Sequence, residues 1–389
     1  QFHDIIPGSS IGEVYQDSRR NYEYAIEQME QAKETAFRSL LEKEENCYSI
    51  YSTSGFEGEE LVWLPVEEKG YFTDESGSAL MSQKSTIEQD KGYYVAVRTK
   101  PYAVIKLVFH PGDETVIREA FTLDDGMLET PYYRIHMNEE GNLTEIYDKE
   151  NGRQVLREGG LGNVLTIYED KPLGNDAWDI DIFYYEKGKK ATLVDSPELV
   201  ENGPLQAVIR FRYLYHQSDI PLDMVVYRHT RRIDFRTHAN WKETHKLLKV
   251  AFETDIRTTK ATYDIQFGHV ERPTHWNNSW DWVKFEVCGH KWADISENDF
   301  GVSLLNDCKY GYSVKDGVIS LSLLRSPKSP DDTADMGEHT FIYALYPHKD
   351  VVTEGGTIEE ALRLNLPAQM VAGAFTTEKQ IVKVDSDRI

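Results

Sequence analysis

The 389-residue sequence predicts a mainly β protein that begins with one long helix. Three observations lead to this fold class. Residues 13–54 contain no Gly or Pro, and apolar side chains recur there at every third or fourth position. From Cys47 onward the apolar pattern changes to the period of two that is typical of strands. No strand–helix alternation or internal repeat interrupts this block, which indicates antiparallel sheets packed as sandwiches.

Residues 1–46 are expected to be the end of a helical bundle. The Pro7-Gly8 turn is followed by Ser10 and Glu13, whose spacing predicts a capping box at the helix start. About 30 residues of helix would be about 45 Å long. The expected apolar stripe comprises Tyr22, Ile26, Met29, Ala32, Ala36, Phe37 and Leu40. A single helix cannot bury such a stripe, so we expect partner helices outside this sequence.

Two β-units are predicted after the helix, a small sandwich over residues 47–128 and a large one over residues 129–389. Strands of the small unit are expected at Tyr48–Ser52, Leu61–Val66, Tyr93–Arg98 and Ala103–Phe109. The large unit should open with a hairpin formed by residues 133–137 and 143–147. Long alternating strands over residues 209–215 and 233–241 predict one buried face each, which favours two packed antiparallel sheets.

Composition excludes several classes of partner. The formal net charge is −23, which argues against nucleic acid and anionic membranes because phosphate binding needs clustered Lys and Arg. The one basic cluster, Arg228–Arg236, is interpreted as the solvated face of a strand. No apolar run reaches about 18 residues, and no signal peptide is visible. The three Cys residues (47, 288 and 308) predict reduced thiols and a cytoplasmic location.

Both ends of the sequence suggest a piece of a longer protein. The chain starts at Gln1 without Met, directly in a dense motif. It stops after Val382–Ile389, a strand-like alternation that has no evident partner. We therefore expect further segments on both sides of this sequence.

The stretch from Arg272 to Tyr312 holds four of the seven Trp residues, at positions 276, 280, 282 and 292. Trp rings stack on flat apolar faces, including those of sugars, and the interleaved Asn, Asp and His offer hydrogen bonds to hydroxyl groups. The alternative is a loop that aromatic anchors fasten to a β-core. Composition alone favours the anchor interpretation, because a buried Trp usually serves packing.

Several strings in this region carry a family resemblance. They are Arg272–Trp282, Leu321–Pro327, Ala334–His339 and Tyr343–His348. Their sequences resemble the C-terminal β-region of glycoside hydrolase family 38, the zinc-dependent α-mannosidases, in its cytosolic or bacterial branch. The resemblance implies that the large unit is a supersandwich of the galactose-mutarotase type. It also implies a catalytic barrel earlier in the same protein.

His3 and Asp4 stand just before the predicted helix. On their own they suggest local turn and capping chemistry, because zinc needs three or four converging ligands and the chain has no HExxH or CxxC motif. His269, His275 and His290 form only a weak ligand set. The resemblance implies that His3 is one of four zinc ligands and that Asp4 contacts the bound mannose. The other ligands, the nucleophile and the acid/base carboxylate would lie in the barrel, so no catalytic residue is assigned to this chain.

A second candidate is the acidic loop that contains Asp176, Trp178 and Asp179 between two expected strands. It could be a solvated turn with one anchoring Trp, or a surface that binds sugar hydroxyls and stacks on a ring. The family branch has a similar Asp-Ala-Trp-Asp loop, which the resemblance places toward the barrel cleft. Asn175 stands where that branch often has Trp, so one stacking contact is absent.

The resulting prediction is the C-terminal part of a retaining α-mannosidase that removes terminal α-linked mannose from glycans, with zinc binding the mannose hydroxyls. Its partners would be a mannose-containing oligosaccharide and the barrel of the same protein, and a homo-oligomer is compatible with the sequence. The alternatives are a non-catalytic carbohydrate-binding or scaffold module and a mannosylglycerate-type hydrolase. Residues 1–389 alone are expected to be inactive. Activity in them would direct the search to Asp176, Asp179, His275, Asp281 and His290.

Overall fold

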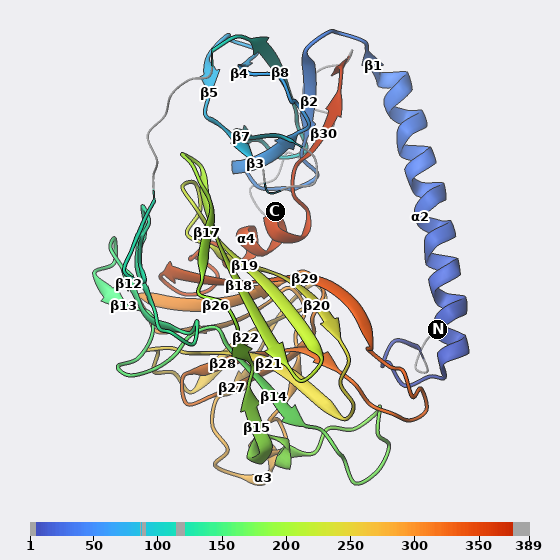
Figure 1. Ribbon diagram of the computed structural model, residues 1–389, viewed down its shortest axis with the longest axis vertical. Helices are drawn as coiled ribbons and strands as arrows, with labels where there is room; N and C mark the ends of the chain where they lie inside the picture. Colours follow the sequence, from blue (N-terminus) through green and yellow to red (C-terminus); the bar gives the residue numbers. More distant parts are fainter. Residues whose placement is uncertain (1–4, 86, 88–90, 114–120, 376–389) are drawn as a thin grey trace.

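Helix α2 (Gly12–Leu40) runs along one side of the computed structural model, which describes residues 5–85, 87, 91–113 and 121–375 (Figure 1). The predicted long helix is confirmed. The predicted capping box is wrong, because the N-cap residue is Ile11 and no side chain caps the helix. The backbone N–H of Ser10 instead donates to the hydroxyl of Tyr15 at 2.8 Å, so the helix begins beyond the proposed box.

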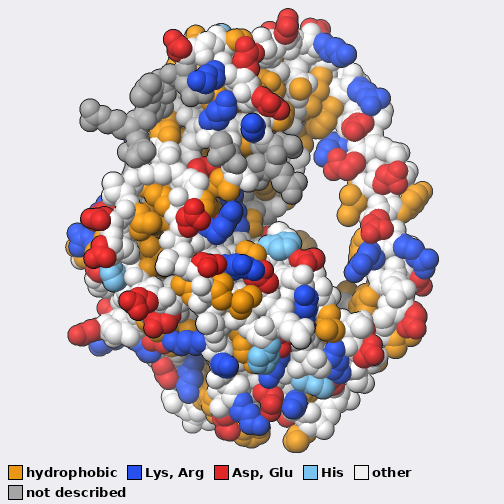
Figure 2. Space-filling view, viewed as in Figure 1, with side chains coloured by type: hydrophobic (Ala, Val, Ile, Leu, Met, Phe, Trp, Pro, Cys, Tyr) orange, Lys and Arg blue, Asp and Glu red, His pale blue; other side chains and the backbone are white. Residues whose placement is uncertain are grey.

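The middle of the apolar stripe of α2 is exposed. Tyr22, Ile26 and Met29 each expose more than half of their surface, and Ser18 is the one described helix residue that is buried. Figure 2 shows open space between the middle of the helix and the β-units. The C-terminal end is attached, since the ring of Phe37 lies 5.2 Å from that of Tyr51 and 6.1 Å from that of Phe375. The part of the stripe that contains Tyr22, Ile26 and Met29 therefore has no covering partner among the described residues.

The small sandwich consists of two antiparallel sheets joined by one apolar core. The five-stranded sheet has the order β30 (Gln369–Ala372), β2 (Cys47–Tyr51), β8 (Val104–Pro111), β4 (Gly70–Asp74) and β5 (Ala79–Leu80). The three-stranded sheet has the order β3 (Gly58–Leu64), β7 (Gly92–Thr99) and β6 (Ser82–Ser85). A separate two-stranded sheet pairs β1 (Leu41–Glu42) with β31 (Ala374–Phe375). The four strands expected from period-two alternation are confirmed.

The predicted limits of the two β-units, at residues 128 and 389, stay a prediction. Two contacts cross these limits, one in strand pairing and one in the apolar core. Strand β30 comes from the far end of the described chain and pairs with β2, with Ile50 opposite Met370. At the other limit, Phe121 and Leu128 belong to the core of the large unit rather than to the small sandwich. The small sandwich is thus assembled from two distant segments. The predicted alternation over residues 382–389 lies outside the described residues.

The large unit contains three antiparallel sheets. A five-stranded sheet has the order β13 (Arg153–Gln154), β12 (Leu143–Asp148), β11 (Tyr133–Met137), β10 (Met127–Glu129) and β9 (Thr122–Asp124). A six-stranded sheet has the order β15 (Gly188–Lys190), β14 (Val164–Glu169), β21 (Lys246–Glu253), β28 (Val318–Arg325), β27 (Gly311–Lys315) and β24 (Val287–Cys288). The ten-stranded sheet comprises β16 (Thr192–Leu193), β17 (Glu198–Asn202), β18 (Gln206–Tyr215), β19 (Ser218–Tyr227), β20 (Ile233–Trp241), β29 (Gly337–Lys349), β26 (Phe300–Asn306), β25 (Trp292–Ser296), β22 (Lys260–Ile265) and β23 (Gly268–Pro273).

One apolar core holds these sheets together, because residues from all three belong to it. In β18 the side chains alternate as predicted, with Phe211 and Tyr213 buried while Arg210 and Arg212 are exposed. The Phe235 ring on β20 lies 5.7 Å from the Phe252 ring on β21, so the ten- and six-stranded sheets pack face to face. The mainly β fold with a large antiparallel sandwich is confirmed.

Helix α4 (Thr357–Asn365) lies where the small sandwich meets the ten-stranded sheet (Figure 1). The basic segment Arg228–Arg236 reaches the same junction, and its interpretation as a solvated face is wrong. Arg232 is nearly buried and its Nε donates to Asp234 at 2.6 Å. The Tyr227 hydroxyl donates to the same carboxylate at 2.7 Å. The strand face is covered by α4 and the small sandwich, so its charges are paired instead of hydrated.

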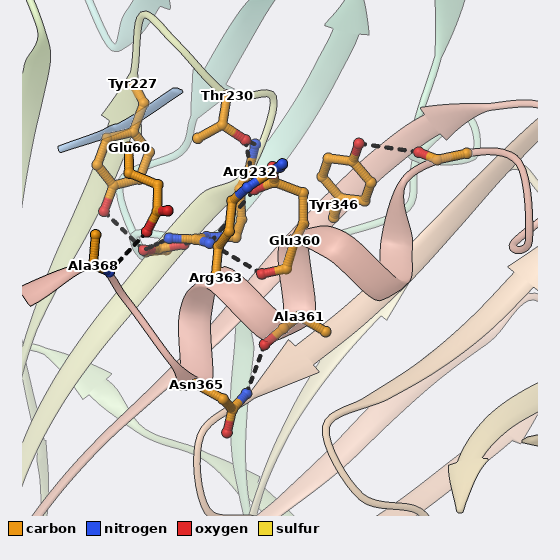
Figure 3. A network of polar contacts seen from close by, with 12 residues as sticks. Glu60, Tyr227, Thr230, Arg232, Tyr346, Glu360, Ala361, Arg363, Asn365 and Ala368 are labelled. Carbon is orange, nitrogen blue, oxygen red and sulfur yellow. Dashed lines mark hydrogen bonds and ion pairs between the residues drawn. The ribbon is translucent and has the colours of Figure 1, made fainter. Parts of the chain in front are cut away.

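Figure 3 shows how this network joins α4, the ten-stranded sheet and the small sandwich. Arg363 of α4 donates from Nη1 to Glu360 at 2.6 Å, and Glu360 accepts from the hydroxyl of Thr230 at 2.8 Å. Glu60 of the small sandwich accepts from the backbone N–H of Ala368 at 2.9 Å. Buried charges that are paired in this way orient the two β-units relative to each other.

Two further findings concern the chain as a whole. None of the three cysteines forms a disulfide. Within the ranges that the structure describes, no helix is both long and apolar enough to cross a membrane.

Candidate functional site

The acidic loop between β14 and the 3-10 helix η1 (Ile182–Lys187) forms a tight turn around Asn175. Asn175 has a positive φ of 53°, a conformation that Asn adopts more readily than most residues. Its carbonyl accepts from the backbone N–H groups of Trp178 at 2.7 Å and Asp179 at 3.0 Å. Farther along, the Asp181 carboxylate accepts from the Leu173 backbone N–H at 3.0 Å. These local contacts fix the direction of the loop side chains.

Asp176 connects this loop to the segment that follows β28. Its Oδ2 accepts from the backbone N–H groups of Lys328 at 2.6 Å and Ser329 at 3.2 Å. The Nε2 of His245 lies 3.1 Å from the same oxygen. Within the described residues, no contact engages Oδ1, so the carboxylate retains one oxygen for a further donor. Asp176 therefore has a positioning role in the loop beside any role in binding.

Arg325 at the end of β28 supports the loop from beneath. Its Nε donates to Asp170 at 2.5 Å, and its two Nη groups donate to the carbonyls of Ala177 at 3.2 Å and Asp176 at 2.7 Å. A third carbonyl, that of Asp179, also accepts from Arg325. Burial raises the pKa of Asp170, which is 1% exposed, while the guanidinium beside it acts in the opposite direction. One cation thus holds the buried carboxylate and three loop carbonyls together.

The loop borders a pocket of about 640 Å³. Asp176, Trp178 and His245 line it, and so does Ser9 from the segment before α2. Trp178 exposes 55% of its surface, so its ring is free to stack on a ligand. The Oγ of Ser9 is buried and has no hydrogen-bond partner in the described structure. The pocket therefore combines an aromatic face, a carboxylate and a hydroxyl that has no partner among the residues described.

His3 and Asp4 lie outside the described residues. The chain that follows them enters the rim of this same pocket at Ser9. Gly12 also lies close to the Asp331 side chain, since an added Cβ would be 3.3 Å from its Oδ1. Ser9 and the acidic loop, which are more than 160 residues apart in sequence, thus line one pocket.

The described residues do not fit a complete metal centre. No group of three or more His, Cys, Asp or Glu side chains in the described part of the chain could hold a metal ion. His275 instead lies 3.5 Å from Asp281, and the backbone N–H of His290 donates to the carbonyl of Asp264 at 3.0 Å. The weak ligand set of three His residues is accordingly not brought together.

The Trp-rich stretch divides into two kinds of residue. Trp292 is 3% exposed and anchors β25, as the packing interpretation expected. Trp280 and Trp282 belong to the short helix α3 (Ser279–Trp282) and expose 79% and 41% of their surface. Anchoring therefore explains only part of this stretch.

Sequence reasoning missed three residues of the site: Ser9, His245 and Arg325. Arg325 lies in the string Leu321–Pro327, which contributed to the family resemblance, but its contacts to the loop depend on strand β28 lying beneath it. His245 has a left-handed backbone conformation with a φ of 50°, which no sequence pattern predicts. Ser9 stands between the predicted Pro7-Gly8 turn and Ser10, and no motif in the sequence marks it.

The structure thus joins a long helix to a small sandwich and a large antiparallel sandwich, with a polar pocket beside an exposed Trp. An alpha-mannosidase from Enterococcus faecalis V583 has this fold, with a TM-score of 0.77 and 16% identity over 95% of this chain and 52% of that chain. Residues 128–333 match the glycosyl hydrolases family 38 C-terminal domain, and residues 1–40 match the alpha mannosidase middle domain. The chain belongs to glycosyl hydrolase family 38.

Curated relatives agree with this assignment. Alpha-mannosidase G of Dictyostelium discoideum is 44% identical over 257 residues, which are 64% of this chain and 24% of that protein. Alpha-mannosidase 2C1 of Homo sapiens is 35% identical over 377 residues, which are 94% of this chain and 34% of that protein. The chain thus spans about a quarter to a third of the length of these relatives.

Proposed function

We propose that this chain is the C-terminal part of a retaining α-mannosidase that hydrolyses terminal α-linked mannose of glycans. The observation that carries the proposal is the pocket that Ser9, Asp176 and Trp178 line together. Ser9 follows His3 and Asp4 by only a few residues, and this supports assigning the two candidates of the sequence to one site. The nucleophile and the acid/base carboxylate belong to a barrel elsewhere in the complete protein.

The residues of this chain then have distinct roles. His3 supplies one ligand to a zinc ion whose remaining ligands come from the barrel, and Asp4 accepts hydrogen bonds from mannose. When bound, zinc supplies an electrophile and template for two sugar hydroxyls. Trp178 offers its ring face to the glycan, and Asp176 keeps the loop closed against the segment after β28. Asp179 adds a carboxylate that is exposed on the same loop.

The metal role is tested by His3→Ala in the complete protein. Losing one of four ligands should weaken zinc binding by several kcal/mol and lower both zinc content and turnover of an aryl α-mannoside. His238→Ala is the matched control, because this His is exposed and pairs with Glu338 away from the pocket. Zinc content and turnover equal to the wild type in His3→Ala would remove this residue from the site.

The loop is tested by Trp178→Ala and Asp176→Asn. Both should lower kcat/KM for a mannoside more than they lower the thermal unfolding midpoint, since Trp178 is half exposed and Asn can still accept the two backbone hydrogen bonds. Trp280→Ala, which removes a ring that is 79% exposed elsewhere, serves as the control. A large fall in stability with unchanged kinetics would show that the loop is only structural.

A substrate panel separates the proposal from its alternatives. Hydrolysis of mannosylglycerate but not of glycan mannosides would favour the mannosylglycerate-type activity. Glycan binding without any hydrolysis would favour a carbohydrate-binding module. The proposal also includes a cytosolic location, supported by three cysteines that form no disulfide.

A further inference from the structure

A second pocket, of about 360 Å³, lies on the six-stranded sheet and is not part of the site described above. It is lined by the hairpin of β27 and β28, by η1, by the segments on both sides of α3 and by Arg157. These elements lie at the end of the large unit that is farthest from the small sandwich (Figure 1). Its volume falls in the range of about 300–1,000 Å³ that is typical of small-ligand sites.

Aromatic rings make up the walls. The ring centroids of Tyr185 and Trp276 are 6.0 Å apart, and those of Tyr184 and Phe285 are 6.4 Å apart. Tyr185 exposes 49% of its surface at the rim. Trp276 belongs to the Trp-rich stretch whose sugar-stacking interpretation the first pocket does not use. Several flat apolar faces around one pocket fit the C–H faces of a pyranose ring.

Polar groups stand between these rings. Ser313 and Ser320 are directly opposite each other on β27 and β28, and both line the pocket. The Nζ of Lys315 lies 3.9 Å from the centre of the Trp276 ring, and Asp316 lines the pocket beside it. Hydroxyl, ammonium and carboxylate groups next to an aromatic face provide the donors and acceptors that sugar hydroxyls need.

A buried ion pair holds this lining in place. Lys249 is 3% exposed, and its Nζ contacts Glu286 and donates to the hydroxyls of Tyr184 at 3.1 Å and Ser313 at 2.9 Å. The Tyr184 hydroxyl in turn donates to Glu286 at 2.6 Å. Two lining side chains are therefore oriented before any ligand arrives, which lowers the entropic cost of binding.

We propose that this pocket is a second carbohydrate subsite, which takes a hexose unit of a glycan whose terminal residue occupies the first pocket. The chain between Asp176 and Tyr185 connects the two, because its first part lines the first pocket and its last part lines the second. The ligand class rests on the proposed function. The subsite would favour branched or extended glycans over small mannosides, since only these can occupy both pockets.

The test compares two substrates of the complete protein. Trp276→Ala should raise KM for a manno-oligosaccharide about five- to tenfold and leave the kinetics of an aryl α-mannoside unchanged. Trp276→Phe, which retains a flat ring, should recover most of the loss. Trp280→Ala is the control, because this exposed Trp lies four residues away and does not line the pocket. Tyr185→Ala at the half-exposed rim repeats the test with little risk to folding.

Binding of an S-linked manno-oligosaccharide, which glycosidases cleave very slowly, separates this inference from the proposed function. Calorimetry should find weaker binding in both alanine variants even if the complete protein hydrolyses no mannoside, in which case only the proposed function fails. Active enzyme in which Tyr185→Ala and Trp276→Ala change neither oligosaccharide binding nor KM would overturn the subsite alone. An equal loss on both substrates would overturn it too, because the pocket would then act on the catalytic centre instead of on the glycan.

Discussion

Replacing Arg325 by Met should open the acidic loop without unfolding the sheets beneath it. The change leaves the buried carboxylate of Asp170 without its cation and removes the donors to three loop carbonyls. Removing one partner of a buried pair costs about 3–5 kcal/mol. The loop can escape this cost by opening, so its opening free energy should fall by about 3 kcal/mol, or about 100-fold in the open population.

Chymotrypsin cleavage after Trp178, followed by mass spectrometry, measures this population when the loop recloses faster than it is cut. The cleavage rate should rise about 100-fold in Arg325→Met. It should fall again as the pH is lowered, because burial raises the pKa of Asp170 and the closed loop takes up a proton once the cation is gone. Asp170→Asn combined with Arg325→Met should recover part of the protection, since it removes the buried charge.

Arg212→Met is the matched control. Arg212 makes a two-pronged contact with Asp219, but Arg212 is exposed and Asp219 is partly exposed, so the change should cost less than about 1 kcal/mol and leave cleavage after Trp178 unaltered. Equal cleavage rates in wild type and Arg325→Met would refute the reasoning, since the loop would then owe its order to local turn contacts.

Three further predictions concern stability and metal content. Burial lowers the pKa of His229 to about 4, so the unfolded chain binds this proton first and stability should fall by about 3 kcal/mol as the pH drops from about 6.5 to about 4. Urea unfolding of His229→Gln should lack most of this loss, and an unchanged pH profile would contradict it. Trp241 is fully buried and donates to Ser326 at 3.3 Å, so Trp241→Ala should cost about 3–5 kcal/mol in thermal unfolding and Trp241→Phe clearly less. An equal loss of stability in Trp241→Ala and Trp241→Phe would show that an aromatic ring at this position is not the main contribution to stability. Residues 1–389 alone should show a β-type circular dichroism spectrum but hold no stoichiometric zinc and hydrolyse no aryl mannoside, because no metal-binding group of three side chains occurs among the described residues. Full zinc content together with turnover would show that the catalytic site lies within residues 1–389.

Local patterns predicted the elements of the fold well. Alternation identified β18 and β20 because each has one face on a shared core, and the three- and four-residue spacing identified α2. The patterns failed where tertiary contacts decide. Arg232 was expected in water, yet α4 and the small sandwich cover it and pair its charge. No local signal marks β30 as a partner of β2, since their pairing depends on the rest of the chain.

The sequence indicated some residues of the candidate site and not others. The excess of carboxylates around Trp178 marked the acidic loop, and the structure places Ser9 beside it. Arg325 and His245 were missed because their function depends on where β28 and a left-handed turn put them, which residue type alone does not encode. The roles of His3 and Asp4 come from family resemblance and stay predictions.

The pairing of β2 with β30 has a consequence for how the chain is made. Ser49 donates to the carbonyl of Gly373, a residue 324 positions later. At about 5–20 residues per second, a ribosome needs some tens of seconds to synthesise the intervening chain. Throughout that time one edge of β2 presents unpaired backbone groups, a template on which nascent chains can associate. Deleting β30 should therefore lower soluble yield more than its few side-chain contacts would suggest, and chaperones should engage the small sandwich until the last strands emerge.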